Sequence, residues 1–135
     1  MMRARFQPWR AMRAEFDRKA VRAFVSDAAE ATEDAFKAGM RSGKSGRIYR
    51  RKRGSHQASA PGEYPAIDSG ALIATVGKKV RAMDMEVGSS AKPYALYLRT
   101  GTGKMARRKM SDDALKEALP GVRSRLKAWA RFRHA

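Results

Sequence analysis

The sequence predicts an α+β fold: a small antiparallel β-sheet flanked by a long N-terminal helix and a C-terminal helix, with long loops. Three observations lead to this prediction. Apolar residues recur at three- and four-residue steps near both ends of the chain, a stretch in the middle alternates with the period of a strand, and prolines and glycines interrupt the region between them. The chain has 135 residues, the size of one domain, so residues 1–135 are expected to fold as a single unit.

The N-terminal helix is predicted from a narrow apolar stripe. Pro8 suits a first helical turn, Val21 and Val25 lie beside the stripe, and Gly39 is expected to end the helix. The stripe itself consists of Met12, Phe16, Ala20, Phe24, Ala28, Ala31 and Ala35. Because many of these residues are small, the helix can approach a neighbouring element closely but contributes little apolar area per turn.

Residues 46–72 are predicted to form an extended basic arm followed by a long loop. Residues 37–53 contain eight Lys and Arg and no acid. Ile48 and Tyr49 are bulky apolar residues within this stretch, which favours a short strand or a hairpin arm centred on them. Residues 56–66 contain two prolines and a glycine, so they are expected to form an irregular loop.

Three shorter elements are expected next. Residues 68–76 begin with capping residues and can start a short helix or turn. Residues 78–87 alternate like one half-buried strand. That strand would place Arg81, Met83, Met85 and Val87 on one face. Residues 94–98 have helical spacing, and Gly101 is expected to break that turn.

The C-terminal helix is predicted over residues 110–133. Ser111 reads as an N-cap and is followed by two acids, which suit a first helical turn. The apolar stripe of this helix consists of Leu115, Leu119, Val122, Leu126, Trp129 and Ala130. Pro120 and Gly121 are expected to bend it.

The composition predicts a thin core and a cationic surface. Leu, Ile, Val and Phe together make up only 20 of the 135 residues, while 30 Lys and Arg against 13 Asp and Glu leave a net charge of +17. A chain with so little bulky hydrocarbon is expected to gain stability by joining copies of itself. The charge alone also favours a second function class, a sequence-nonspecific DNA-binding protein, although no recognition helix or zinc finger is present.

No catalytic, cofactor-binding or metal site is predicted. The absence of Cys excludes disulfides and thiolate metal sites, and two histidines cannot form a multi-histidine site alone. Gly43-Lys44-Ser45 lacks the earlier glycine and the preceding strand of a phosphate-binding loop. The acids Asp84 and Glu86 read as solvating residues of a strand. No membrane contact is expected either, because the apolar stretch 71–76 is far too short to span one.

Two clusters of residues resemble the signature of a known family. The first reads Gly-Arg-Ile-Tyr at 46–49 and His-Gln-Ala-Ser-Ala-Pro-Gly-Glu-Tyr-Pro-Ala-Ile-Asp-Ser-Gly-Ala-Leu at 56–72. The second reads Val-Gly-Ser at 87–89, Tyr-Ala-Leu-Tyr-Leu-Arg-Thr-Gly-Thr at 94–102 and Lys-Met-Ala-Arg at 104–107. In order and spacing they resemble the gene-product-ten-like head–tail joining, or tail-completion (tail terminator), proteins of long-tailed bacteriophages.

The resemblance implies a structural virion protein and not an enzyme. Members of that family close into rings, typically hexamers, at the head-proximal end of the tail. There the ring caps the tail tube, meets the head–tail connector (stopper or adaptor) proteins, and surrounds the genomic DNA that passes through its lumen. The expected location is therefore the tail or neck of the virion, with the host cytoplasm as the site of assembly. A minor capsid or neck protein at another position is the alternative within virion assembly.

The same resemblance, together with the residue types, assigns expected roles within the two clusters. The expected contacts with a neighbouring subunit or partner ring are Arg47, Tyr49, Arg50, Arg51, Arg53, His56, Gln57, Pro61, Glu63, Tyr64 and Pro65. The expected turn positions are Gly62, Gly70, Gly101 and Thr102. Tyr94, Tyr97 and Leu98 are expected to pack inside the subunit.

Overall fold

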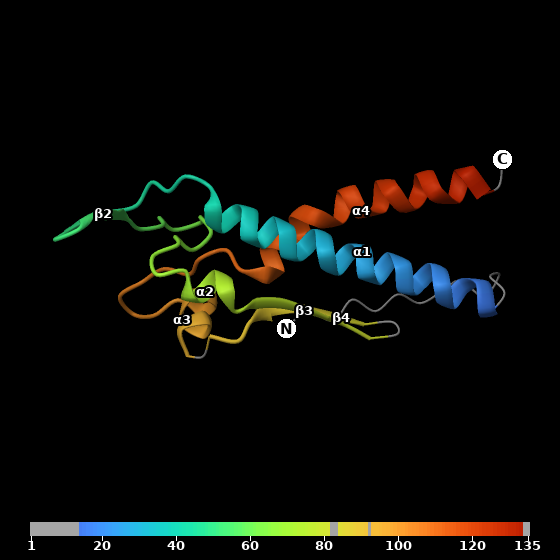
Figure 1. The fold of residues 1–135 in the computed structure, drawn as a ribbon, viewed down its shortest axis with the longest axis horizontal. Helices are drawn as coiled ribbons and strands as arrows, with labels where there is room; N and C mark the ends of the chain where they lie inside the picture. The colour runs from blue at the N-terminus through green and yellow to red at the C-terminus, as the bar shows by residue number, and fades with distance from the viewer. Residues whose placement is uncertain (1–13, 82–83, 92, 134–135) are drawn as a thin grey trace.

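A computed structural model describes residues 14–81, 84–91 and 93–133 and has the predicted α+β class (Figure 1). Its elements are the helices α1 (Ala14–Arg41), α2 (Ala71–Ala74), α3 (Tyr94–Thr100) and α4 (Ser111–Arg133) and the strands β1 (Ile48–Arg51), β2 (Gly54–Gln57), β3 (Val76–Val80) and β4 (Met85–Ser89). In Figure 1, α1 lies between α4 on one side and the β3–β4 hairpin with α2 and α3 on the other.

The long N-terminal helix is confirmed, and its buried face is centred slightly differently from the predicted stripe. The buried side chains of α1 are Val21, Val25, Ala28, Ala29, Thr32, Phe36 and Met40. Phe24, Ala31 and Ala35, which were expected at the centre, are half-buried at the edges of that face. Pro8 and Met12, which were also expected in this helix, lie outside the described residues.

Gly39 does not end α1, which continues to Arg41. The glycine is instead a point of close approach, because a Cβ atom at this position would lie 2.3 Å from Cδ2 of Tyr64. The aromatic ring therefore packs directly on the helix backbone. Sequence reasoning took this glycine as a helix terminator because the approaching ring comes from 25 positions further along the chain.

In the part of the chain that the structure describes, the β structure consists of two separate antiparallel hairpins and not of one sheet. Strand β1 pairs with β2, and β3 pairs with β4. The single strand predicted over 78–87 is wrong, since the chain reverses between Arg81 and Asp84, whose backbone N–H and C=O groups bond reciprocally at 2.8 and 3.3 Å. Met85 and Val87 of β4, which were predicted to share a face, are both buried against α1, whereas Arg81 is exposed.

The C-terminal helix α4 runs back along α1 (Figure 1). Its first turn carries Asp112 and Asp113, and the Asp113 carboxylate accepts a hydrogen bond from the Met110 N–H at 3.1 Å. Pro120 lies inside the helix. Further along, Arg125 donates two hydrogen bonds of 3.0 Å to the Asp27 carboxylate of α1 and so ties the two helices together.

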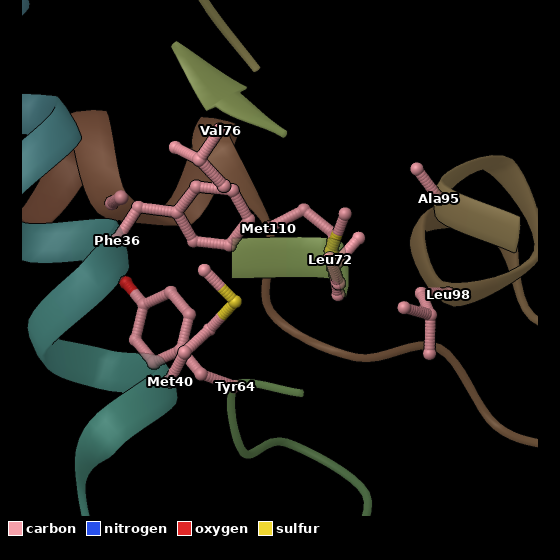
Figure 2. Packing of buried hydrophobic residues seen from close by; sticks show 9 residues of the cluster. Phe36, Met40, Tyr64, Leu72, Val76, Ala95, Leu98 and Met110 are labelled. Carbon is pink, nitrogen blue, oxygen red and sulfur yellow. The ribbon is translucent and has the colours of Figure 1, made fainter. Parts of the chain in front are cut away.

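Among the described residues, the hydrophobic core forms two small clusters placed along α1. The first contains Phe36, Met40, Tyr64, Leu72, Val76, Ala95, Leu98, Met110 and Ala114 (Figure 2). The second contains Val21, Val25, Ala28, Ala29, Met85, Val87, Leu115 and Val122. Many of these side chains are small, so the expectation of a thin core agrees with the packing of the described residues.

Candidate functional site

The predicted arm is a β-hairpin formed by β1 and β2 that projects beyond the rest of the described chain (Figure 1). At its foot, Gly46 and Arg47 exchange backbone hydrogen bonds of 3.0 and 2.9 Å with Ala58. A Cβ atom on Gly46 would lie 2.4 Å from the Ala58 carbonyl oxygen, so only glycine lets the two segments close the foot of the arm this tightly. The Gln57 side-chain amide donates a third bond to the Gly46 carbonyl at 3.2 Å.

The register of the hairpin determines which of its side chains share the face that contacts Asp68. Tyr49 is opposite His56, and Arg51 is opposite Gly54, so these residues share one face. On that face Arg51 donates two hydrogen bonds, of 2.6 and 2.9 Å, to the Asp68 carboxylate. The Arg51 guanidinium lowers the pKa of Asp68 from its ordinary value. This pair links the arm to the segment that precedes α2.

The side chains of the arm divide by chemistry along its length. Ile48 and Tyr49, near the foot, are 59% and 46% exposed. The Arg47 guanidinium lies over the Tyr49 ring, 5.4 Å from its centroid. At the tip, Lys52 and Arg53 form the turn, and Gly54 follows with φ +123°, a backbone conformation that favours glycine. The foot is therefore partly apolar, whereas the tip is cationic.

The loop after the arm is bound to the body of the protein through Glu63. Its carboxylate accepts hydrogen bonds from the Ala60 N–H at 2.8 Å, the Ser45 N–H at 3.2 Å and the Ser45 hydroxyl. These hydrogen bonds lower the pKa of Glu63 from its ordinary value, and the bond from the Ser45 hydroxyl has the largest effect. On its other side, the Glu63 carbonyl accepts a bond of 3.0 Å from the Lys109 N–H.

Two further contacts bind the loop to α4 and to the segment before it. The Arg108 guanidinium donates bonds of 2.9 Å to the hydroxyl and the carbonyl of Ser59. The Tyr64 hydroxyl donates a bond of 2.8 Å to the Glu117 carboxylate of α4. Burial and this neighbouring carboxylate raise the pKa of Tyr64 above its ordinary value. Polar contacts at Ser59, Glu63 and Tyr64 thus hold the irregular loop against the body of the protein.

The residues expected to contact a partner fall into two groups in the structure. Tyr64 and Pro65 belong to the core and do not present their side chains at the surface, which corrects their expected place. The reason is that Tyr64 lies on Gly39 and beside Phe36, with ring centroids 6.0 Å apart. The exposed members are Arg47, Tyr49, Arg50, Arg51, Arg53, Gln57 and Pro61, and the half-buried ones are His56 and Glu63.

A second surface of apolar side chains lies on α3. Of the three residues expected to pack, only Leu98 is buried, whereas Tyr94 and Tyr97 are 54% and 47% exposed. Leu96, which sequence reasoning did not single out, is 55% exposed beside them. The reason is the orientation of this short helix. It buries Ala95 and Leu98, which are spaced i, i+3, so Tyr94 and Tyr97 point outward.

The expected turn positions have the following geometry. Gly62, Gly70 and Gly101 have φ values of +82°, +83° and +78°, in the left-handed region. Gly101 is also crowded, since a Cβ atom there would lie 2.9 Å from the Met105 carbonyl oxygen. Thr102 forms an isolated antiparallel bridge with Met105.

Within residues 14–81, 84–91 and 93–133 there is no group of three or more His, Asp or Glu side chains that could hold a metal ion. Among the same residues, no helix is both long and apolar enough to cross a membrane. No protein-family model, curated protein or solved structure matches this chain.

Proposed function

We propose that this chain is a structural virion protein that forms a ring, with six copies as the expected number, at the head-proximal end of a long bacteriophage tail. In this role it caps the tail tube, joins it to the head–tail connector and surrounds the DNA that passes through the lumen. The two sequence clusters that resemble tail-completion proteins support the proposal.

The observation that carries the ring is the placement of the exposed apolar side chains. The most exposed of them form two groups, Ile48 and Tyr49 at the foot of the arm and Tyr94, Leu96 and Tyr97 on α3, whereas Ile67 and Val80 elsewhere are only 37% and 36% exposed. A ring requires a head-to-tail interface, in which one surface of each copy meets a different surface of the next. Tyr-rich exposed patches of this kind are typical of protein interfaces.

The α3 surface is the better anchor of such an interface. Tyrosine rings supply large contact area at low cost in side-chain entropy. Tyrosine is also enriched among the few interface residues whose truncation costs about 2 kcal/mol or more of binding free energy. In addition, the arm of another copy brings both apolar and guanidinium groups, and guanidinium groups bind well over aromatic faces.

The test is assembly in infected cells by a phage that lacks the gene, complemented with variants. Loss of the protein should leave full heads and separate tails that do not join, visible by electron microscopy. Leu96→Asp should reproduce this defect, because it places a charge in the proposed interface. Ala128→Asp, which introduces the same charge at an exposed position of α4, should still give complete particles. Complete particles without the protein would refute the proposed function, and complete particles with Leu96→Asp would refute the α3 interface.

A further inference from the structure

We propose that the tip of the β1–β2 arm binds duplex DNA through its phosphate backbone, with Arg50, Lys52 and Arg53 as the contacting cations. This inference concerns the isolated chain as well as any assembly of it. It therefore does not depend on whether the protein forms a ring.

The first argument is that the tip cations have no partner in the described part of the chain. Three other cations of this region are already engaged: Lys44 bonds the Gly39 carbonyl at 2.6 Å, Arg47 lies over Tyr49, and Arg51 is paired with Asp68. The side chains of Arg50, Lys52 and Arg53 are exposed and make no ion pair or hydrogen bond among the described residues.

The second argument is the local concentration of like charge. Residues 35–62 contain no acid, so the arm has no carboxylate of its own to neutralise its tip. Cations held this close repel one another, and a polyanion relieves that repulsion while releasing its own condensed counterions. A protein with a net charge of +17 is attracted to DNA over long distances, and the arm gives this attraction a defined point of contact.

The third argument is shape. The four-residue strands extend about 13 Å from foot to tip, and two paired strands lie about 5 Å apart between their backbones. A two-stranded ribbon of this kind fits the major groove of B-DNA, which is about 12 Å wide, or lies along the phosphates at its edge. The Arg51–Asp68 pair and the closed foot hold the ribbon in one direction, so less freedom is lost on binding.

The composition of the tip favours DNA over an acidic protein surface. A stable protein interface needs a buried apolar centre, but the tip residues from Arg50 to Ser55 include no apolar side chain. The apolar residues of the arm lie at its foot. Phosphate contacts need only cations and hydrogen-bond donors, which the guanidinium groups, the Lys52 ammonium and the Ser55 hydroxyl provide.

The test is equilibrium binding of the purified full chain to a fluorescent 25-base-pair duplex of arbitrary sequence, followed by anisotropy between 50 and 200 mM NaCl. The arm variant Arg50→Gln, Lys52→Gln, Arg53→Gln is compared with a control that removes the same charge from exposed positions of α4, Lys116→Gln, Arg123→Gln, Lys127→Gln. Circular dichroism and thermal melting show that both variants remain folded.

If the three tip cations each contact a phosphate, the slope of log affinity against log salt becomes shallower by about 2.7 in the arm variant. The wild type then loses about 40-fold more affinity than the arm variant between 50 and 200 mM salt. The α4 control should keep a slope within about 1 of the wild type. Equal losses in the two variants would overturn the proposal, because they would show binding by diffuse charge.

A competition experiment separates DNA from an acidic protein partner. Polyglutamate at the same concentration of negative charge should displace the duplex from the wild type much less effectively than unlabelled DNA does. Equally effective displacement, lost in the arm variant, would overturn the proposal and assign the tip to acidic protein surfaces. Neither result depends on assembly, so failure here leaves the proposed ring untouched, and normal DNA binding does not support the ring.

Discussion

The arm and the loop that follows it are neighbours in the sequence but have opposite relations to the rest of the protein. The arm, residues 46–57, is held at its foot and by the Arg51–Asp68 pair, and the rest of it lies in solvent. The loop, residues 58–66, is bound by Glu63 and Ser59 and inserts Tyr64 into the core. A regular element is therefore the projecting part here, and an irregular segment is part of the body.

The difference shows that polar contacts can replace regular structure. Buried or half-buried backbone groups of a loop need partners. Here the Glu63 carboxylate accepts a hydrogen bond from the Ala60 N–H, and the Arg108 guanidinium donates one to the Ser59 carbonyl. The hairpin satisfies its own backbone groups between its strands, so it can leave the body without that cost. The following predictions test this contrast, from the largest expected effect to the smallest.

The largest difference in the free energy of unfolding is expected between variants of Tyr64, in the loop, and Tyr49, in the arm. Tyr64→Ala removes a ring that is 7% exposed and a hydrogen bond to Glu117, so it should lower the free energy of unfolding by about 3–5 kcal/mol. Tyr49→Ala, in the arm, should change it by less than about 0.5 kcal/mol. Urea denaturation of both variants measures this. Equal effects would contradict the division into a projecting arm and a packed loop.

The close approach of the loop to α1 should make a helical glycine irreplaceable. Gly39→Ala places a methyl group 2.3 Å from the Tyr64 ring, and overpacking of this kind costs about 1–3 kcal/mol. The opposite sign is expected for Gly121→Ala in α4, where a Cβ atom would lie at an ordinary contact distance of 3.5 Å from the Arg125 side chain. This control should gain up to about 1 kcal/mol from helix propensity. Stabilisation by both changes, in thermal melting, would show that the ring does not lie on Gly39.

The loop should also make stability depend on pH through Glu63. Its pKa is lowered in the folded state, so its stabilising contribution is present above the ordinary pKa of a glutamate and is lost as the pH falls through the folded value. Glu63→Gln should lower stability at pH 7 and reduce its decline in acid. Denaturation at several pH values from 7 to 3 measures both effects. Glu30→Gln, on the exposed side of α1, provides the baseline, and a Glu63→Gln curve parallel to wild type would contradict the role of the carboxylate.

The smallest effect is expected at the Arg51–Asp68 pair, which links the arm to the segment before α2. Asp68→Asn removes the charge that holds Arg51, and because the pair is exposed, global stability should hardly change. Amide hydrogen exchange in β1 and β2 should nevertheless become faster, while exchange in the β3–β4 hairpin stays the same. Unchanged exchange in the arm would mean that the foot alone holds its direction.

Much of this organisation is visible in the sequence, and the exceptions share one cause. Helical periodicity predicts α1 and α4, and the basic stretch around Ile48 predicts the arm, because these signals are local. The hairpin turn at Arg81–Asp84 was missed, since it contains no glycine or proline among its described residues. The role of Gly39 depends on Tyr64, which lies far away in the chain.

The candidate surfaces follow the same rule. The exposed cations of the arm were predicted, because charged residues in an acid-free stretch have few places to be buried. The outward direction of Tyr94 and Tyr97 was not predicted, since a helix of seven residues is too short for its apolar phase to be read with certainty. The burial of Ala95 and Leu98 in the core shows which side of α3 is exposed to solvent.

A three-dimensional reconstruction of the head-proximal end of the tail in intact particles tests the proposed ring most directly. We expect a closed ring of this chain in which the α3 surface of each copy is covered by the next and the arm tips point toward the DNA. Particles in which this chain lies elsewhere, or in which Tyr94, Leu96 and Tyr97 face solvent in every copy, would contradict it.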